Sequence, residues 1–188
     1  MRKALAFPLA LMLLALLAVP GLAQTASTKP AAAPAAGGVR TEILRQIDDA
    51  QQKLLALAEA TPADKLTWRP NDKVRSASEV FMHVAGGNYF IPTLWGVKPP
   101  EGLSREMEKE TDKAKVIDAL KKSFEHVHKA IESTSDADLD RKIKIFDHEG
   151  TVREGMMIVA SHAHEHLGQS IAYARMNGIV PPWSAGGQ

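Results

Sequence analysis

Four segments of this chain place their apolar residues at steps of three and four positions, the spacing that gathers them on one face of an α-helix. Two of them, residues 39–60 and 112–133, carry an apolar stripe among charged residues. The other two begin at Ala77 and at about Thr151, and the last one runs to residue 177. Because the connections carry little strand pattern, we expect an all-α protein built as a four-helix bundle.

Capping residues mark the ends of these helices. Ser76 stands three residues before Glu79, a capping box that begins the second helix at Ala77. Pro92 should kink or end this helix, because proline has no amide hydrogen for the helical pattern. Gly178 follows the fourth helix and is expected to cap its C-terminus.

The connections between the helices are expected to be polar loops. The segment 98–112 holds two adjacent prolines and most of the charge run SREMEKETDKAK, and it is interpreted as a solvated loop that leads into the third helix. The segment 136–149 is interpreted as a polar connection with a short apolar alternation around Ile143. Residues 147–150 are expected to form its closing turn.

The N-terminal residues indicate a secretory signal peptide, residues 1–23. A positively charged start, MRK, precedes an apolar stretch and the small residues GLA, the pattern of a cleavage site. An uncleaved membrane anchor is the alternative, but Pro8 and Pro20 interrupt a stretch that falls short of about 20 apolar residues. We therefore expect a secreted or periplasmic protein that is not attached to a membrane after cleavage. Residues 24–38 are interpreted as a flexible linker, residues 39–183 as the bundle and residues 184–188 as a tail.

The composition excludes several kinds of site and partner. The chain has no cysteine, so it can form neither a disulfide framework, nor a thiolate nucleophile, nor a cysteine-based metal site. Its 23 lysines and arginines are balanced by 22 acidic residues and show no clustered basic excess. We therefore expect no nucleic-acid partner.

The stretch SHAHEHLGQ, residues 161–169, concentrates three of the seven histidines. At about 100° per residue, positions four apart differ by about 40° around a helix. His162 and His166 therefore share a face, while His164 points away from it. Two imidazoles at this spacing can bind one cation, but the pair alone is a weak signal, because histidines also make hydrogen bonds in a core or lie in solvent.

A third ligand decides between these interpretations, because catalytic zinc sites use three protein ligands and leave one position open. His83 is the best candidate, since it is the only other histidine inside an apolar helical segment. His126 and His128 are weaker candidates, because one is expected to face solvent and the other to lie at the edge of the third helix's stripe. His148 is expected to lie in a turn.

Several neighbours of the histidine pair have expected roles of their own. Gln169 and Tyr173 continue its stripe and could orient a substrate or hydrogen-bond a ligand. Gly86 and Gly87, in the second helix, would let a neighbouring helix or a ligand approach closely. Glu165 lies off the ligand face and is interpreted as a solvated helix charge, so no general base is identified.

Two stretches, SASEVFMHVAGGNYF and HAHEHLGQSIAYARMNGIVPP, are similar to the DinB/YfiT-like family, whose members are regarded as metalloenzymes. The approach KLTWRPNDKVRS resembles the same family, and the likeness spans residues 39–183. The resemblance implies an up-down-down-up topology for the bundle. It also implies a divalent metal site made of His83, His162 and His166, the three histidines that the face argument selects.

The resemblance and the histidines together suggest a metal-dependent enzyme, either a hydrolase or a thiol S-transferase, that acts on an unknown small-molecule substrate. The alternatives are an extracytoplasmic bundle that binds a metal or small ligand without turnover, and a metal-free bundle with packed histidines. Imidazole suits several divalent ions, and we expect zinc, with nickel or iron as alternatives. The resemblance further implies a possible homodimer.

Overall fold

The structure, a computed structural model, describes residues 38–186. The expected signal peptide, the linker up to residue 37 and the last two residues of the tail lie outside this range. Within it, no helix is both long enough and apolar enough to cross a membrane.

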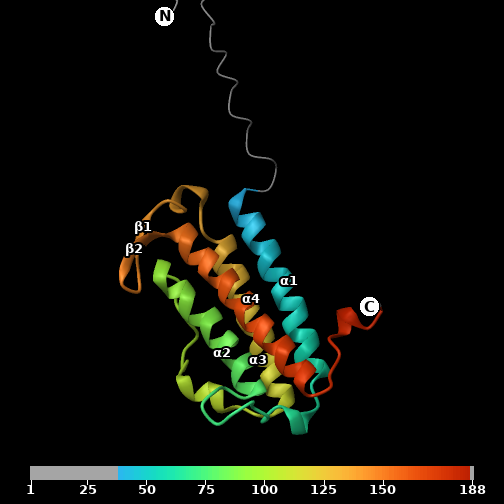
Figure 1. The fold of residues 1–188 in the computed structure, drawn as a ribbon. Helices are drawn as coiled ribbons and strands as arrows, with labels where there is room; N and C mark the ends of the chain where they lie inside the picture. The colour runs from blue at the N-terminus through green and yellow to red at the C-terminus, as the bar shows by residue number, and fades with distance from the viewer. Residues whose placement is uncertain (1–37, 187–188) are drawn as a thin grey trace, which may run out of the picture. The chain divides into compact units, whose positions relative to one another are not determined.

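The main elements are four α-helices, as expected. Their bounds are Val39–Ala60 for α1, Ala77–Phe90 for α2, Lys113–Glu132 for α3 and Val152–Met176 for α4 (Figure 1). The colour gradient in Figure 1 shows that α1 and α4 run in one direction and that α2 and α3 run in the other. The all-α four-helix bundle with up-down-down-up topology is therefore confirmed.

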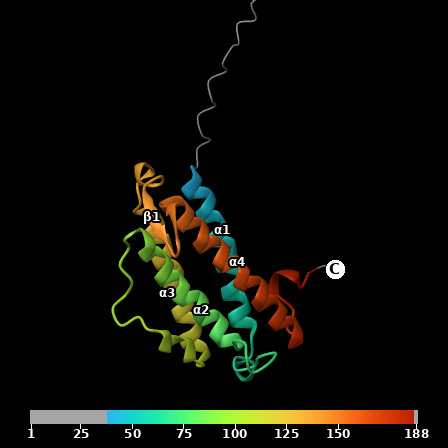
Figure 2. The ribbon, with the colours of Figure 1, turned by 60° about the vertical axis from the view of Figure 1, so that its left-hand side comes forward.

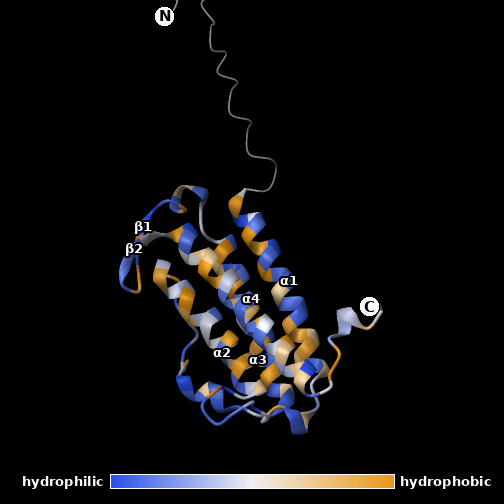
Figure 3. Ribbon diagram, viewed as in Figure 1, coloured by the Kyte–Doolittle hydropathy of each residue, from blue (hydrophilic) through white to orange (hydrophobic). Residues whose placement is uncertain are grey.

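The helices pack in an order that differs from their order in the chain. The helix α1 packs against α3 and α4, and α2 packs against the same two helices. The consecutive pairs α1 with α2, and α3 with α4, therefore lie across the diagonals of the bundle. Fully buried apolar side chains from all four helices fill the centre, among them Ile47, Val84, Phe124 and Met156. Figure 3 shows these hydrophobic stretches along the helices and the polar character of the connections.

The expected helix ends are confirmed. The Ser76 side chain accepts a hydrogen bond from the Glu79 amide, and the Glu79 side chain accepts one from the Ser76 amide, which completes the capping box. The helix α2 ends at Phe90, and Pro92 lies in the 3₁₀ helix Ile91–Trp95 that follows it. Gly178, with a φ of 72°, lies directly after the C-cap of α4. The further 3₁₀ helices are Ala63–Lys65, Arg105–Lys109, Asp136–Asp138 and Pro182–Ser184.

The connection between α3 and α4 differs from its prediction. Strands β1 (Lys142–Ile145) and β2 (His148–Thr151) form an antiparallel hairpin, in which Ile145 pairs with His148. The turn therefore consists of Phe146 and Asp147, and the expected turn over 147–150 is wrong. The hairpin forms because Ile143 and Ile145 are both buried, and pairing them with a second strand satisfies the backbone beside them.

The connection between α2 and α3 returns along the bundle. Because α2 and α3 run in the same direction, the chain has to cover the length of α2 again before α3 begins (Figure 2). The 3₁₀ helix Arg105–Lys109 lies in this connection and packs against α2. A segment far from α2 in sequence is thereby placed over the middle of that helix.

Candidate metal centre

Three histidine side chains converge between α2 and α4. His83 comes from α2, and His162 and His166 come from α4, one turn apart. One nitrogen atom from each ring lies within 4.8 Å of the other two. The ring centroids are 5.1 Å apart for His83 and His162, 4.7 Å for His83 and His166, and 4.6 Å for His162 and His166. Zinc–nitrogen bonds of about 2.0–2.1 Å in a tetrahedral site place the nitrogens about 3.4 Å apart, which lies within the limit of 4.8 Å.

The close approach of the two helices depends on Gly87. A β-carbon at this position would overlap Cε1 of His162 and would lie 2.8 Å from its Nδ1. A β-carbon at Gly86 would meet only Sδ of Met107, at the ordinary distance of 3.8 Å. The expectation that a small residue here lets a neighbouring helix approach is confirmed at Gly87.

Hydrogen bonds orient two of the three imidazoles. Nδ1 of His83 lies 2.9 Å from Oε1 of Glu108, and Nδ1 of His166 lies 2.9 Å from Oε1 of Gln169. Because a carboxylate oxygen and an amide oxygen only accept, both Nδ1 atoms donate, and in the neutral form of each ring Nε2 carries the free lone pair. Gln169 in turn donates to the Tyr173 hydroxyl at 3.0 Å. Partners of this kind fix the tautomer and the ring orientation of metal-binding histidines.

His162 has the most strongly lowered pKa of the group, although His166 is the side chain with the least exposed surface. Nδ1 of His162 is buried and has no hydrogen-bond partner among the described residues. Burial, and then the charges of His166, His83 and Arg75, lower the pKa of His162 to about 4. Burial is also the main reason why the pKa of His166 is lowered, although its bond to Gln169 acts in the opposite direction. Both rings are therefore neutral at pH 7, so a cation would not have to displace a proton from them.

Glu108 is the residue of this site that the sequence analysis missed. Its Oε1 accepts from His83, and its Oε2 accepts from Nε of Arg75 at 3.1 Å. Burial alone would raise the pKa of Glu108, but the hydrogen bonds from His83 and Arg75 outweigh it and hold that pKa below its ordinary value of 4.5. The interpretation of the charge run as solvated is therefore wrong at Glu108, because the returning connection packs this carboxylate against α2.

The other histidines lie elsewhere and have partners of their own. His164 points toward α1, where its Nε2 lies 3.0 Å from the carbonyl oxygen of Gln46. His126 packs against the ring of Tyr89, and His128 lies 3.0 Å from Oδ1 of Asp48. Both are half-buried, so the expectation that one of them faces solvent is wrong. His148 lies in β2 rather than in a turn and bonds to Glu154.

Two of the three histidines, His83 and His162, face a large hollow. It has a volume of about 770 Å³, which is within the range of small-molecule sites. His83 and His162 line it together with Arg75 and Glu108, and residues of α2, the returning connection, the hairpin tip and α4 complete the wall. Glu165, expected to be a solvated charge, is exposed but lines the same hollow.

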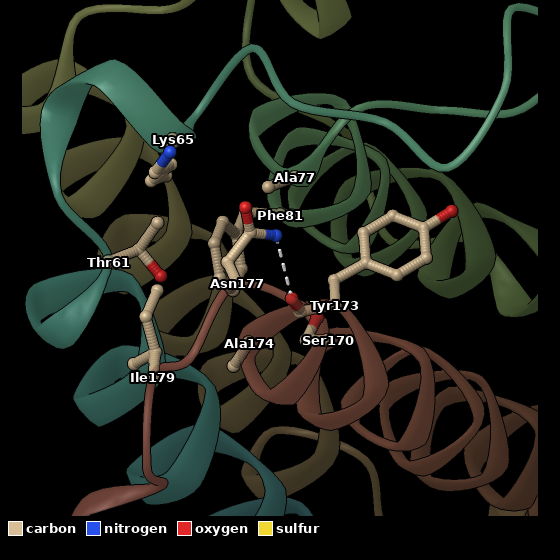
Figure 4. Close-up of a pocket in the computed structure, with 9 residues that line it drawn as sticks. All are labelled: Thr61, Lys65, Ala77, Phe81, Ser170, Tyr173, Ala174, Asn177 and Ile179. Carbon is tan, nitrogen blue, oxygen red and sulfur yellow. Dashed lines mark hydrogen bonds between the residues drawn. The ribbon is translucent and has the colours of Figure 1, made fainter.

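A second cavity lies further along α4, between Ser170 and Lys65, and does not include the three histidines (Figure 4). Its volume of about 10 Å³ suits about one water molecule. Oγ of Ser170 lines it and has no hydrogen-bond partner among the described residues. We interpret this cavity as a position for a buried water, because it is too small for a substrate.

An up-down-down-up bundle with three histidines converging between its second and fourth helices defines a class of helical protein with a potential metal centre. The chain belongs to the DinB superfamily, which its sequence matches over residues 46–170. Among curated protein sequences, none matches this chain.

Solved structures similar to this one include three bacillary proteins. A DinB-like protein from Bacillus cereus has 16% sequence identity and a TM-score of 0.67, with 74% of this chain and 93% of that chain covered. The DinB-like protein YjoA from Bacillus subtilis has 21% identity and a TM-score of 0.60, with the same coverage. YfiT from Bacillus subtilis, described as a probable metal-dependent hydrolase with an unusual four-helix bundle topology, has 13% identity, a TM-score of 0.59 and coverage of 75% and 89%. At these identities the likeness concerns the fold alone.

Proposed function

We propose that this protein is a metal-dependent hydrolase whose divalent ion is held by His83, His162 and His166. The observation that carries the proposal is the convergence of three imidazole nitrogens within 4.8 Å of one another, beside a hollow of about 770 Å³. Two of these rings already present a free Nε2, and the third has a buried nitrogen without a partner. This donor set fits a divalent ion that prefers imidazole ligands.

The reaction class is supported by one relative of the same fold. YfiT is described as a probable metal-dependent hydrolase, and its bundle covers 75% of this chain. We place zinc first among the candidate ions, with nickel or iron as alternatives. We also propose that the protein acts outside the cytoplasm, on the strength of the N-terminal sequence MRKALAFPLALMLLALLAVPGLA.

The residues around the three histidines have distinct roles in this proposal. When bound, a divalent ion held by three neutral imidazoles supplies Lewis acidity toward a water or a carbonyl oxygen. Glu108 keeps the proton of His83 on Nδ1, and Gln169 does the same for His166. Glu165 makes no hydrogen bond within residues 38–186 and lines the hollow, so its carboxylate can accept a proton during hydrolysis.

An open coordination position distinguishes an enzyme from a bundle that only stores the ion. We would replace the metal with cobalt(II) and record the visible spectrum with and without azide, which adds to an open position. A spectral change that is present in the wild type and absent in His162→Ala supports an open site on these ligands. An azide-insensitive spectrum would favour the non-catalytic binding bundle.

Turnover is then tested with a panel of activated esters and amides on the zinc-loaded protein. Hydrolysis that disappears in His162→Ala and is retained in His164→Ala would support the hydrolase assignment, because both variants change a histidine of α4. Equal rates of hydrolysis in the two variants would show that the proposed metal centre does not catalyse the reaction.

A further inference from the structure

Two exposed phenylalanines stand at the hollow. Phe90 at the end of α2 is 52% exposed and Phe146 at the hairpin tip is 59% exposed, and both line the hollow. Apolar side chains continue from them along its wall, namely Ile91, Leu103, Met107 and Ile158. We call Phe90 and Phe146 the rim. A contiguous apolar surface beside a polar centre is typical of a ligand site rather than of a surface selected only for solubility.

The backbone at Phe146 points to the same conclusion. Phe146 has a φ of 47° and is the only residue other than glycine with a positive φ in the range 38–186. It is the first central residue of a two-residue hairpin turn, the position that glycine prefers when it alone has a positive φ. A bulky side chain here strains the fold and buries little surface in return. Strain of this kind is expected where a side chain serves binding rather than stability.

The polar part of the hollow includes an arginine, Arg105, that can pair with an anion. Arg75 and Arg105 both line it. Arg105 is exposed and makes no ion pair with another described residue. The opposing charges are Glu108, which is bound to Arg75 and His83, and Glu165. A divalent ion bound to the three histidines would add positive charge to this balance.

We propose that the hollow binds a small amphipathic carboxylate, with its carboxylate near the arginines and the metal and its aliphatic chain between Phe90 and Phe146. The contribution of the metal rests on the proposed function. The contributions of the rim and of Arg105 do not depend on it, since these residues line the hollow whether or not an ion is bound.

The test measures binding of straight-chain carboxylates from butanoate to decanoate to the full protein by calorimetry, in zinc-loaded and metal-free form. Each added methylene should tighten binding about threefold until the chain fills the rim. Octanol, which has a chain but no charge, should bind at least about tenfold more weakly than octanoate. Loss of the zinc should weaken all carboxylates by a similar factor and leave the dependence on chain length unchanged.

Variants separate the two halves of the site. Phe90→Ala and Phe146→Gly should reduce the tightening per methylene, while Arg105→Gln should weaken every carboxylate by about the same factor, roughly tenfold. Met176→Ala removes an exposed apolar side chain outside the hollow, and Arg45→Gln removes an exposed arginine of α1, so neither should change either quantity. Circular dichroism of each variant verifies that the bundle is folded.

Affinity that does not depend on chain length, or a dependence that survives both rim substitutions, would overturn the proposal. If octanol bound as tightly as octanoate, the proposed recognition of the carboxylate group would be wrong. If no zinc binds but the chain-length dependence and the effects of the variants remain, the metal-dependent function is wrong, while the binding of amphipathic carboxylates is supported. If zinc binds to the three histidines and no carboxylate binds, the proposed ligand is wrong and the metal site is retained.

Discussion

Glu108 lies 25 residues after His83 in the chain, yet its Oε1 is 2.9 Å from Nδ1 of that histidine. The contact exists because α2 and α3 run in the same direction, so that the connection between them returns along the length of α2 (Figure 2) and brings Glu108 to His83. It gives one of the candidate ligands a charged hydrogen-bond partner, and Arg75 holds that partner from the other side. The up-down-down-up topology thus supplies part of the site, in addition to the helices that bear the histidines.

The first prediction concerns Glu108 itself. Replacing Glu108 with alanine removes the acceptor that fixes the tautomer of His83, and we expect zinc affinity to fall about 10- to 100-fold. Competition with a chromogenic chelator measures this change. Glu106→Ala is the matched control, because Glu106 lies in the same 3₁₀ helix and bonds only to Lys109 within the described part of the chain. Equal affinities for the two variants would show that Glu108 does not support the site.

A second prediction compares the adjacent glycines of α2. Alanine at position 87 would collide with the His162 ring, whereas alanine at position 86 would make an ordinary contact with Met107. Gly87→Ala should therefore bind much less zinc than the wild type. Gly86→Ala should bind as much zinc as the wild type, and its free energy of unfolding should rise by up to about 1 kcal/mol. Elemental analysis and urea titration measure both quantities. A full equivalent of zinc in Gly87→Ala would contradict the close approach of the two helices.

The third prediction tests the strain at the hairpin tip. Phe146→Gly should raise the free energy of unfolding by about 1 kcal/mol, because relief of the positive φ exceeds the entropy cost of glycine. A thermal melt should show a rise in Tm of about 3 °C. Phe90→Ala, at the other rim position, removes the same aromatic group but relieves no backbone strain, so its Tm should not rise. A lower Tm for Phe146→Gly would mean that the side chain stabilises the turn.

The fourth prediction is a pH dependence at the start of α2. Burial alone would raise the pKa of Glu79, but bonds with the Ser76 amide and with Arg69 hold it below its ordinary value of 4.5. A carboxyl whose pKa is lowered on folding stabilises the protein above the pKa of the unfolded chain and loses this effect as pH falls through the folded value. Glu79→Gln should therefore cost about 1 kcal/mol at pH 7 and less near pH 3.

Urea titrations at the two pH values measure the cost of Glu79→Gln. Glu125→Gln, a change at an exposed position in the middle of α3, is the control and should differ little from the wild type at either pH. A cost for Glu79→Gln that is the same at pH 3 and pH 7 would show that the charge of Glu79 does not contribute to the cap.

Much of the fold could be predicted from the sequence because its signals are local. The spacing of apolar residues within each helix and the capping box at Ser76 depend on residues a few positions apart. The same holds for the shared face of His162 and His166, which lie one turn apart on α4. The topology could be predicted only from the family resemblance. His83 was selected because it lies in an apolar helical segment, since no spacing along the chain connects it to α4.

The rest depended on contacts between distant segments. The hairpin turn at Phe146 was missed because a bulky residue with a positive φ contradicts local turn preferences. Glu108 was missed because its surroundings in the sequence, SREMEKETDKAK, are those of a solvated segment. Its role follows from where the returning connection lies, which only the packed structure determines.

The proposed function depends on the binding of one divalent ion by His83, His162 and His166. This binding is tested most directly by elemental analysis of the protein, purified without a histidine tag and loaded with zinc, in the wild type, His162→Ala and His164→Ala. A three-histidine site should hold about one equivalent of metal per chain in the wild type and in His164→Ala, and almost none in His162→Ala. A wild type that binds no metal, or a His162→Ala variant that retains a full equivalent, would contradict the proposed site.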